Sequence, residues 1–219
     1  TGESLTETDK LAEACFNMMK NMYKKEYSEF LGMFYGIHVS TIKSLESDYI
    51  NITPEPFFNL TLPIGNKKTL IGCFEEYTKI EKMEREDENN DNRIFNDKTN
   101  KKENASKHIN FWNLPEVLVI TLKRFGNNIR KNQEFISFPL TNLDLSSYVV
   151  GYDNKSYIYD LYGICNHSGG VSGGHYTAFI KNANDNWYHC NDTNIQKIGN
   201  TDILKSPKAY CFFYRKQKK

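Results

Sequence analysis

The chain has 219 residues, of which 25% are charged, and its formal net charge at pH 7 is +1. This length suits a single domain with a sizeable hydrophobic core, and the charge lacks the basic excess of nucleic-acid-binding proteins. No apolar run reaches the roughly 18 residues of a membrane span, and the N-terminus lacks a signal-peptide pattern. We therefore expect neither a nucleic acid nor a membrane as a partner.

The cysteines bear on the cellular compartment. There are five of them, an odd number without any Cys-x-x-Cys spacing, which speaks against a disulfide framework. Glycosylation sequons begin at Asn166 and Asn191, on either side of the histidine motif described below, where glycans would crowd the surface. We expect an intracellular protein, cytoplasmic or nuclear.

Hydrophobic periodicity predicts the elements in chain order. Residues 8–34 are predicted to be helical, residues 36–62 to form strands, and residues 69–77 to form a short helix. The stretch 83–107 is dense in charge, acidic first and basic after, and its composition predicts a solvated, mobile loop. From Phe111 onward, short apolar strands alternate with polar turns.

The most informative segment is the glycine-rich run 159–176, which ends at His175 and the tyrosine after it. Glycines let the backbone approach closely because they lack a Cβ atom. Residues 176–180 alternate as a strand, 182–186 have the composition of a turn, and 187–192 form a second strand. This pattern predicts a β-hairpin.

Two registers of this hairpin are open. If Lys181 faces Asp185, His175 lies opposite Asn191; if the turn closes one residue later, it lies opposite Asp192. Directly opposed side chains share a face of the sheet, so either register places an amide or a carboxylate beside the imidazole. A catalytic histidine needs such a partner to fix its tautomer. The alternative is a core histidine in an ordinary hairpin.

These residues resemble the histidine box of the ubiquitin-specific proteases, a family of papain-like cysteine deubiquitinases. The family pattern is matched without a gap by Tyr159, Leu161, Ile164, His167, Gly169, Gly174, His175 and Tyr176. The resemblance extends upstream through Leu114–Phe125 and downstream through Trp187–Asp192 and Ala209–Arg215, so that it covers roughly residues 28–215.

The resemblance implies an α+β, papain-like fold with an antiparallel sheet called the palm, β-rich fingers and the remnant of a helical thumb. Residues 1–219 would be a single, partial catalytic domain. Within it, residues 8–34 would be the last thumb helix, 36–112 the fingers with a mobile insertion at 83–107, and 113–217 the palm with the histidine box.

The resemblance also implies roles for individual residues. His175 would be the general base and acid, oriented by Asn191 or, in its place, by Asp192. The substrate would be the C-terminal Gly-Gly tail of ubiquitin, carried by ubiquitin itself or by ubiquitinated proteins. Loops at 126–135 and 168–172 would frame the channel for this tail, and its lining would include Phe125, His167, Gly173, Gly174 and Tyr176.

Two departures from the family pattern lead to further expectations. The family usually clamps the fingers with zinc on two Cys-x-x-Cys pairs, but the matching positions here hold Ser44, Ser47, Asn96 and Thr99. None of these is a good ligand for structural zinc. We therefore expect no metal and no other cofactor, and fingers held by strand pairing alone.

The second departure concerns the nucleophile. The family's Asn-x-Gly-Asn-Thr-Cys segment, which supplies the nucleophile and the oxyanion hole, is not in this chain. Cys15 lacks the preceding Gly-Asn and is expected to be a small buried hydrophobe. We therefore expect a deubiquitinating cysteine protease domain, inactive alone, whose nucleophile lies on a segment before Thr1 or on a separate chain. The alternatives are an inactive ubiquitin-binding or scaffolding module and a hydrolase for another ubiquitin-like protein.

Overall fold

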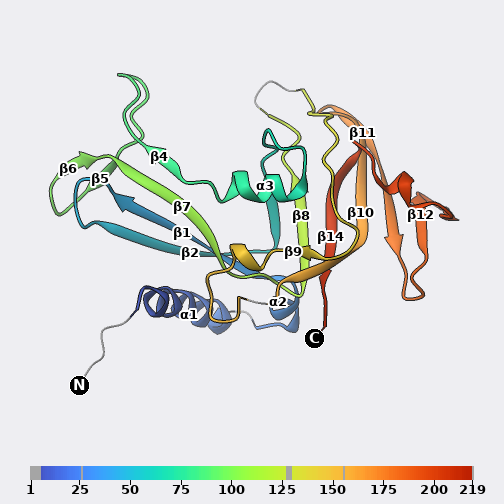
Figure 1. Cartoon of the computed structure of the whole chain (residues 1–219), viewed down its shortest axis with the longest axis horizontal. Coiled ribbons are helices and arrows are strands. Elements are labelled where there is room, and N and C mark those ends of the chain that lie inside the picture. The colour runs from blue at the N-terminus through green and yellow to red at the C-terminus, as the bar shows by residue number, and fades with distance from the viewer. Residues whose placement is uncertain (1–5, 26, 127–129, 155, 219) are drawn as a thin grey trace.

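The computed structural model describes residues 6–25, 27–126, 130–154 and 156–218. Two large β-sheets lie side by side, with helix α1 (Glu7–Lys25) along one face of the first sheet and helix α3 (Leu70–Tyr77) between the two (Figure 1). We call the first sheet the fingers and the second the palm. None of the described helices is long and apolar enough to cross a membrane.

The helical prediction for residues 8–34 resolves into two helices, α1 (Glu7–Lys25) and α2 (Glu29–Phe34). The second helix begins where the Ser28 side chain accepts a hydrogen bond from the Phe30 amide, a typical N-cap. The buried face of α1 carries Ala12 and Cys15, which pack against Val39 and Trp112 of the fingers. The first helix is therefore held by a small core of its own.

The fingers form an antiparallel sheet in the order β2-β1-β7-β4. Its strands are β1 (Gly36–Ser44), β2 (Ile50–Phe57), β4 (Glu81–Met83) and β7 (Ala105–Asn113). A separate hairpin at the tip pairs β5 (Ile94–Asn96) with β6 (Lys101–Glu103). The prediction of a loop over 83–107 is wrong for these strands, because composition does not register the side-chain contacts that organise the tip.

The palm sheet has the order β13-β12-β11-β10-β14-β8-β3, with β9 also paired to β10. All its pairs are antiparallel except β3–β8, which is parallel, so the expected antiparallel palm has one exception. Its strands are β3 (Asn59–Leu62), β8 (Val117–Leu122), β9 (Leu143–Asp144), β10 (Ile158–Gly170), β11 (Gly173–Lys181), β12 (Trp187–Asn191), β13 (Asn194–Lys197) and β14 (Ala209–Lys216).

The main core lies under the palm. The short helix predicted at residues 69–77 is α3 (Leu70–Tyr77), capped by the Thr69 side chain, and it buries Cys73 and Phe74 against this sheet. Full burial of one such apolar side chain stabilises the fold by roughly 1.5–3 kcal/mol. Because β3 and α3 belong to the palm sheet and its core, the fingers predicted at 36–112 are interrupted there. Two 3-10 helices, Ser146–Tyr148 and Thr201–Leu204, complete the described elements.

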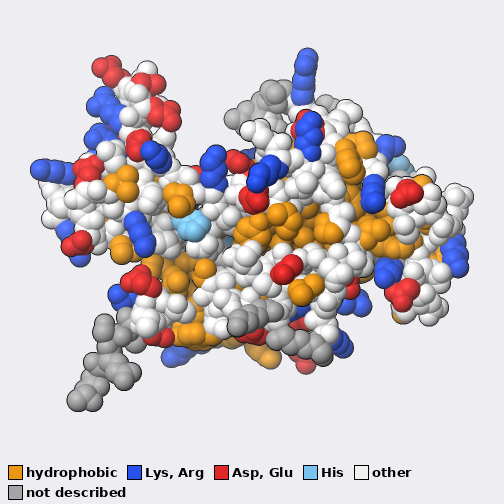
Figure 2. Space-filling model, in the orientation of Figure 1, with side chains coloured by type: hydrophobic (Ala, Val, Ile, Leu, Met, Phe, Trp, Pro, Cys, Tyr) orange, Lys and Arg blue, Asp and Glu red, His pale blue; other side chains and the backbone are white. Residues whose placement is uncertain are grey.

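A cavity of about 690 Å³ lies between α3 and β4, lined by charged side chains that include Glu76, Lys82 and Lys107. Figure 2 shows charged side chains around the notch between fingers and palm. No histidine or cysteine lines this cavity. Its size alone does not make it a catalytic site.

Candidate active site

The hairpin predicted around His175 is formed by β11 and β12, but in a third register. Lys181 pairs with Trp187 and Ala178 with Cys190, so both predicted registers are wrong. The loop between the strands is longer than the prediction allowed. The Asn182 side chain accepts hydrogen bonds from the backbone amides of Asn184 and Asn186, each at 3.0 Å. These bonds stabilise the longer loop.

The histidine nevertheless meets the predicted amide. His175 Nε2 lies 2.6 Å from Asn191 Oδ1, a contact made along the diagonal of the ladder. With Oδ1 as the acceptor, Nε2 carries the ring proton and Nδ1 is left to accept one. Asp192 lies in the turn to β13 with φ of 50°, and among the described contacts its carboxylate makes no hydrogen bond to His175.

The predicted substrate-binding residues come together in one place. A groove of about 290 Å³ is lined by the two chain neighbours of His175, Gly174 and Tyr176, and by Phe125, His167, Gly170, Val171 and Gly173. These residues come from the segment after β8, the end of β10, the turn that follows it and the start of β11. Their role in binding a substrate stays a prediction. Of the two predicted framing loops, the one at 126–135 includes residues 127–129, which lie outside the described residues.

Close packing explains one of the two glycines before His175. A Cβ atom on Gly174 would lie 2.3 Å from His167 Nε2 and 2.4 Å from the Ser168 carbonyl oxygen. Across the strand pair, Gly169 has φ of 116°, a conformation that favours glycine. A Cβ atom on Gly173 would meet nothing within 4 Å. Gly174 is thus required by the fold, whereas Gly173 leaves open space at the groove.

An aromatic cluster surrounds the His167 ring, and three of its members, Phe125, His167 and Tyr176, line the groove. The His167 ring centroid lies 4.7 Å from that of Tyr176, 5.8 Å from that of Phe125 and 5.8 Å from that of Tyr210. Sequence reasoning assigned no role to Tyr210. A signal was available, because Tyr210, Phe212 and Tyr214 alternate along β14 and the first of them reaches beyond the core.

His167 is unlike His175, since it is only 4% exposed. Burial, together with the nearby Lys131, lowers the pKa of His167, so its imidazole is neutral at pH 7. The Lys131 ammonium donates a hydrogen bond to the His167 carbonyl. A neutral buried ring that lines the groove is suited to contact with a peptide rather than to proton transfer.

No cysteine lines the groove. Cys15 is fully buried between α1 and the fingers, and this burial raises its pKa to about 11. Burial likewise raises the pKa of Cys211 to about 11 and raises that of Cys165. A thiol in such an environment is a poor nucleophile at pH 7. The expectation that Cys15 is a buried hydrophobe is confirmed.

The four positions expected to have lost zinc ligands converge on one carboxylate, Glu103. Its Oε2 accepts hydrogen bonds from the Ser44 and Ser47 hydroxyls, both at 2.6 Å. Its Oε1 accepts from the Thr99 hydroxyl at 2.6 Å and from Asn96 Nδ2 at 2.9 Å. Led by the bonds from Ser44 and Ser47, this set lowers the pKa of Glu103 to about 2.

This arrangement does not fit zinc, because all four side chains are oxygen or amide groups that already donate to Glu103. Among the described residues, no group of three or more His, Cys, Asp or Glu side chains could hold a metal ion. The expectation that strand pairing alone holds the fingers is wrong, since the Glu103 network joins the β1–β2 turn to the β5–β6 hairpin.

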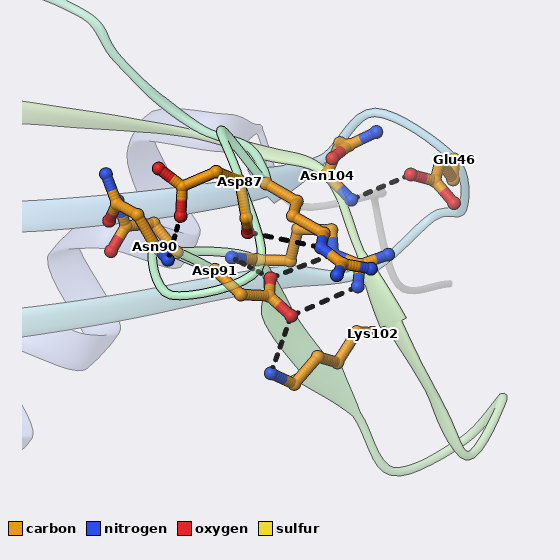
Figure 3. Close-up of polar contacts among 9 residues, drawn as sticks. Glu46, Asp87, Asn90, Asp91, Lys102 and Asn104 are labelled. Carbon is orange, nitrogen blue, oxygen red and sulfur yellow. Dashed lines mark hydrogen bonds and ion pairs between the residues drawn. The ribbon is translucent and has the colours of Figure 1, made fainter.

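A second set of contacts braces the same tip (Figure 3). The Asp91 carboxylate accepts hydrogen bonds from Arg93 at 2.9 and 3.1 Å and from Lys102 at 2.8 Å. Hydrogen bonds from Arg93 and Lys102 lower the pKa of Asp91. The backbone amide of Asn104 donates a hydrogen bond to the Glu46 carboxylate at 2.7 Å. The charge-dense sequence of this region therefore forms specific pairs and not only a solvated surface.

Comparison with known proteins agrees with this geometry. The family model for ubiquitin carboxyl-terminal hydrolases (UCH) matches residues 5–214. Ubiquitin carboxyl-terminal hydrolase 9 of Arabidopsis thaliana is 44% identical over 116 residues, which are 51% of this chain and 13% of that protein. Ubiquitin carboxyl-terminal hydrolase 5 of Saccharomyces cerevisiae is 30% identical over 209 residues, which are 87% of this chain and 25% of that protein.

Solved structures are similar over nearly the whole chain. A structure of the yeast SAGA DUB module with an Sgf73 mutant contains a chain that matches with a TM-score of 0.76 and 30% identity, covering 92% of this chain and 45% of that one. The Ubp8/Sgf11/Sus1/Sgf73 module bound to ubiquitin aldehyde matches with a TM-score of 0.72 and 29% identity, covering 93% and 47%. The chain thus spans less than half of these chains and a quarter or less of these two curated relatives. On the family match over residues 5–214, the chain belongs to the ubiquitin carboxyl-terminal hydrolase family, the ubiquitin-specific proteases.

Proposed function

We propose that this chain is the part of a deubiquitinating cysteine protease that supplies the general base, the groove for the ubiquitin tail and the fingers. The observation that carries the proposal is the 2.6 Å contact between His175 Nε2 and Asn191 Oδ1. It orients an exposed imidazole on β11, between two residues that line the groove, and the other ring nitrogen has no side-chain partner among the described contacts. The nucleophilic cysteine comes from residues outside this chain.

The proposed reaction uses His175 twice. Its Nδ1 takes the proton of the cysteine thiol, and the thiolate attacks the carbonyl carbon of the last glycine of ubiquitin, whose C–N bond to the amine then breaks. The imidazolium then gives this proton to the leaving amine, and a thioester remains. Water, deprotonated by His175, hydrolyses the thioester and frees the thiol. Asn191 keeps the ring oriented through both proton transfers.

The groove supports the choice of substrate. An extended tail that ends in two glycines has no side chains near the scissile bond, and the open space at Gly173 suits such a tail. The rings of Phe125, His167 and Tyr176 line the groove and offer apolar contact. The partners we propose are ubiquitin and ubiquitinated proteins, as in the relative whose structure holds ubiquitin aldehyde.

The free cysteines support an intracellular setting for this activity. All five thiols are free, three of them only partly buried, as is usual in a reducing compartment such as the cytoplasm or nucleus. The buried state of Cys15 favours a second candidate function, a ubiquitin-binding module without catalysis. In that case the groove would bind the tail and no thiol would join it.

A ubiquitin C-terminal amide reporter tests the proposal. The isolated 219-residue chain should be inactive, and supplying the nucleophile-bearing segment, fused or as a separate chain, should restore hydrolysis. His175→Ala should then lower kcat/KM by about 10²–10⁴-fold, as expected for loss of a general base. His108→Ala in the fingers is the matched control and should keep activity.

The other outcomes are distinct. Tail-dependent binding of ubiquitin without hydrolysis, even in the complemented protein, would favour the binding module. Hydrolysis of a reporter built on another ubiquitin-like protein, and not of the ubiquitin reporter, would change the substrate. A covalent ubiquitin adduct on Cys15 of the isolated chain would refute the assignment of the nucleophile to another segment.

A further inference from the structure

Arg124 is a buried cation without a carboxylate partner among the described ion pairs. It follows β8, it is 1% exposed, and none of the described salt bridges includes it. Burial lowers its pKa, but a guanidinium stays protonated in proteins. Burying a charge is costly unless hydrogen bonds compensate it. The groups that accept hydrogen bonds from Arg124 therefore indicate which segments of the fold this residue connects.

Three backbone carbonyls surround the guanidinium. Nε donates to the Ala209 carbonyl at 2.9 Å, and Nη1 donates to the carbonyls of Asn132 at 3.0 Å and Glu134 at 2.9 Å. The Arg124 carbonyl in turn accepts a hydrogen bond from the Asn132 amide at 2.7 Å. One residue thus ties the segment 131–134 to the beginning of β14.

Both tied pieces contact residues that line the groove. Ala209 precedes Tyr210, whose ring lies 6.3 Å from that of Phe125. Lys131 pairs with Phe125 in an isolated bridge and donates to the His167 carbonyl. Arg124 itself does not line the groove. Its contacts set the distance between the Phe125 side of the groove and the His167 side.

We propose that Arg124 is a positioning residue for binding of the ubiquitin tail, acting through the segment 131–134 and Tyr210 without touching the tail. This inference rests on the proposed function, since the tail is the ligand of that groove. A misplaced wall would weaken contacts along the tail, whereas contacts of ubiquitin elsewhere on the protein would be unchanged.

The chemistry requires arginine at this position. A planar guanidinium presents five N–H donors in a fixed fork and reaches carbonyls on two separate segments at once. A lysine ammonium keeps the charge but is a single point on a flexible stem. Arg124→Lys is therefore the informative variant, because it separates geometry from charge.

The test compares binding of intact ubiquitin with binding of ubiquitin lacking its last two glycines, using the purified protein and calorimetry. For the wild type, the intact protein should bind more tightly. Arg124→Lys should reduce the advantage of intact ubiquitin about tenfold, the effect of losing one or two hydrogen bonds at the wall. It should leave binding of truncated ubiquitin unchanged.

Arg215→Lys is the matched control. Arg215 is exposed on β14 and stacks over the Tyr162 ring, 4.8 Å from its centroid, where no groove residue lies. This variant should behave as the wild type with both ubiquitins. An equal loss for intact and truncated ubiquitin in Arg124→Lys would indicate a general structural role and overturn the inference.

Hydrogen exchange keeps the inference testable if Arg124→Lys does not fold. In the free wild-type protein, the Asn132 amide should exchange as slowly as the amides of β14, because Arg124 fixes its segment. Fast exchange there would overturn the inference without any variant. Equal wild-type affinity for both ubiquitins would instead refute the proposed function, and wild-type tail dependence that Arg124→Lys retains would refute the inference alone.

Discussion

The fingertip around Glu103 and the groove around His175 treat their polar groups in opposite ways. Glu103 is 4% exposed, and both carboxylate oxygens accept hydrogen bonds from side chains of two separate segments. His175 is exposed, and only one of its ring nitrogens has a side-chain partner among the described contacts. Both carboxylate oxygens of Glu103 thus have hydrogen-bond partners, whereas one ring nitrogen of His175 is left without a side-chain partner among the described contacts.

Unpaired buried atoms follow the same division. Among the described residues, the buried side-chain atoms without a hydrogen-bond partner belong to Arg124, Asn166 and His167. All three residues lie at the groove end of the palm, and none lies in the fingers. Buried polar groups are nearly always paired in folded proteins, and violations of local rules concentrate at functional sites. The difference separates a region built for stability from a region built to take a ligand.

Removal of the Asn191 amide should give the largest effect on catalysis. Asn191→Ala leaves His175 Nε2 without its acceptor, so kcat/KM of the complemented enzyme should fall about 100-fold. Its melting temperature should barely change, because Asn191 is half-buried at a strand end. The ubiquitin reporter and a thermal melt measure the two quantities.

A neighbouring pair of variants checks this assignment. Asn191→Asp keeps an acceptor at the same atom and should keep most of the activity. Asp192→Asn tests the other residue proposed to orient the ring, and it should have no effect because the described contacts give Asp192 no bond to His175. Loss of activity in Asp192→Asn with a normal Asn191→Ala would reverse the assignment.

Replacement of Gly174 should give the next largest effect. In Gly174→Ala, the new Cβ atom would clash with His167 Nε2 and with the Ser168 carbonyl. We expect tail-dependent ubiquitin binding to fall at least tenfold, since the backbone must move at the groove. Gly199→Ala is the control and should bind as the wild type, because its Cβ atom would meet nothing within 4 Å and Gly199 does not line the groove. Unchanged binding in Gly174→Ala would contradict the assigned groove.

The sequence predicted the groove better than it predicted the fingertip. The hairpin strands follow from local alternation, whereas the aromatic and glycine positions and the pairing of Asn191 with His175 follow from the resemblance to the family. The register was wrong because the loop length depends on hydrogen bonds of the Asn182 side chain, which composition does not encode. A diagonal contact replaced the directly opposed one.

The Glu103 network lay beyond the reach of sequence patterns. Its donors Ser44 and Ser47 lie 59 and 56 residues away along the chain. The segment that carries Glu103 has a composition typical of a solvated loop, and its strands are only three residues long. The sequence shows that all four zinc-ligand positions are substituted, but it does not show that the carboxylate of Glu103 accepts hydrogen bonds from the four side chains.

Glu103→Gln should reduce stability and spare catalysis. The glutamine side chain has an acceptor oxygen but a donor NH2 group in place of the second oxygen, so it cannot accept all four hydrogen bonds. The melting temperature should therefore fall by roughly 5 °C. Reporter hydrolysis at 25 °C should stay as in the wild type. Glu81→Gln, at an exposed position of β4, is the matched control and should change neither quantity. A fall in kcat equal to that of Asn191→Ala would remove the distinction between the two regions.

The same variant has a defined pH dependence. The ordinary pKa of Glu103 is 4.5, and the folded protein lowers it to about 2. A carboxylate with a lowered pKa stabilises the fold above its unfolded pKa and loses this contribution as pH falls through the folded value. The difference in melting temperature between wild type and Glu103→Gln should therefore be full above about pH 5 and shrink toward pH 2.

Metal chelation should give the smallest effect, which is none. Ser44, Ser47, Asn96 and Thr99 donate to a carboxylate and leave no soft ligand for zinc. Metal binding to a structural site contributes directly to folding. A protein whose fingertip is held by hydrogen bonds to Glu103 should therefore keep its melting temperature in excess EDTA. Elemental analysis should find no stoichiometric zinc. One zinc ion per chain, or a lower melting temperature after chelation, would show that the fingertip is closed by a metal and that the Glu103 network is not what holds it.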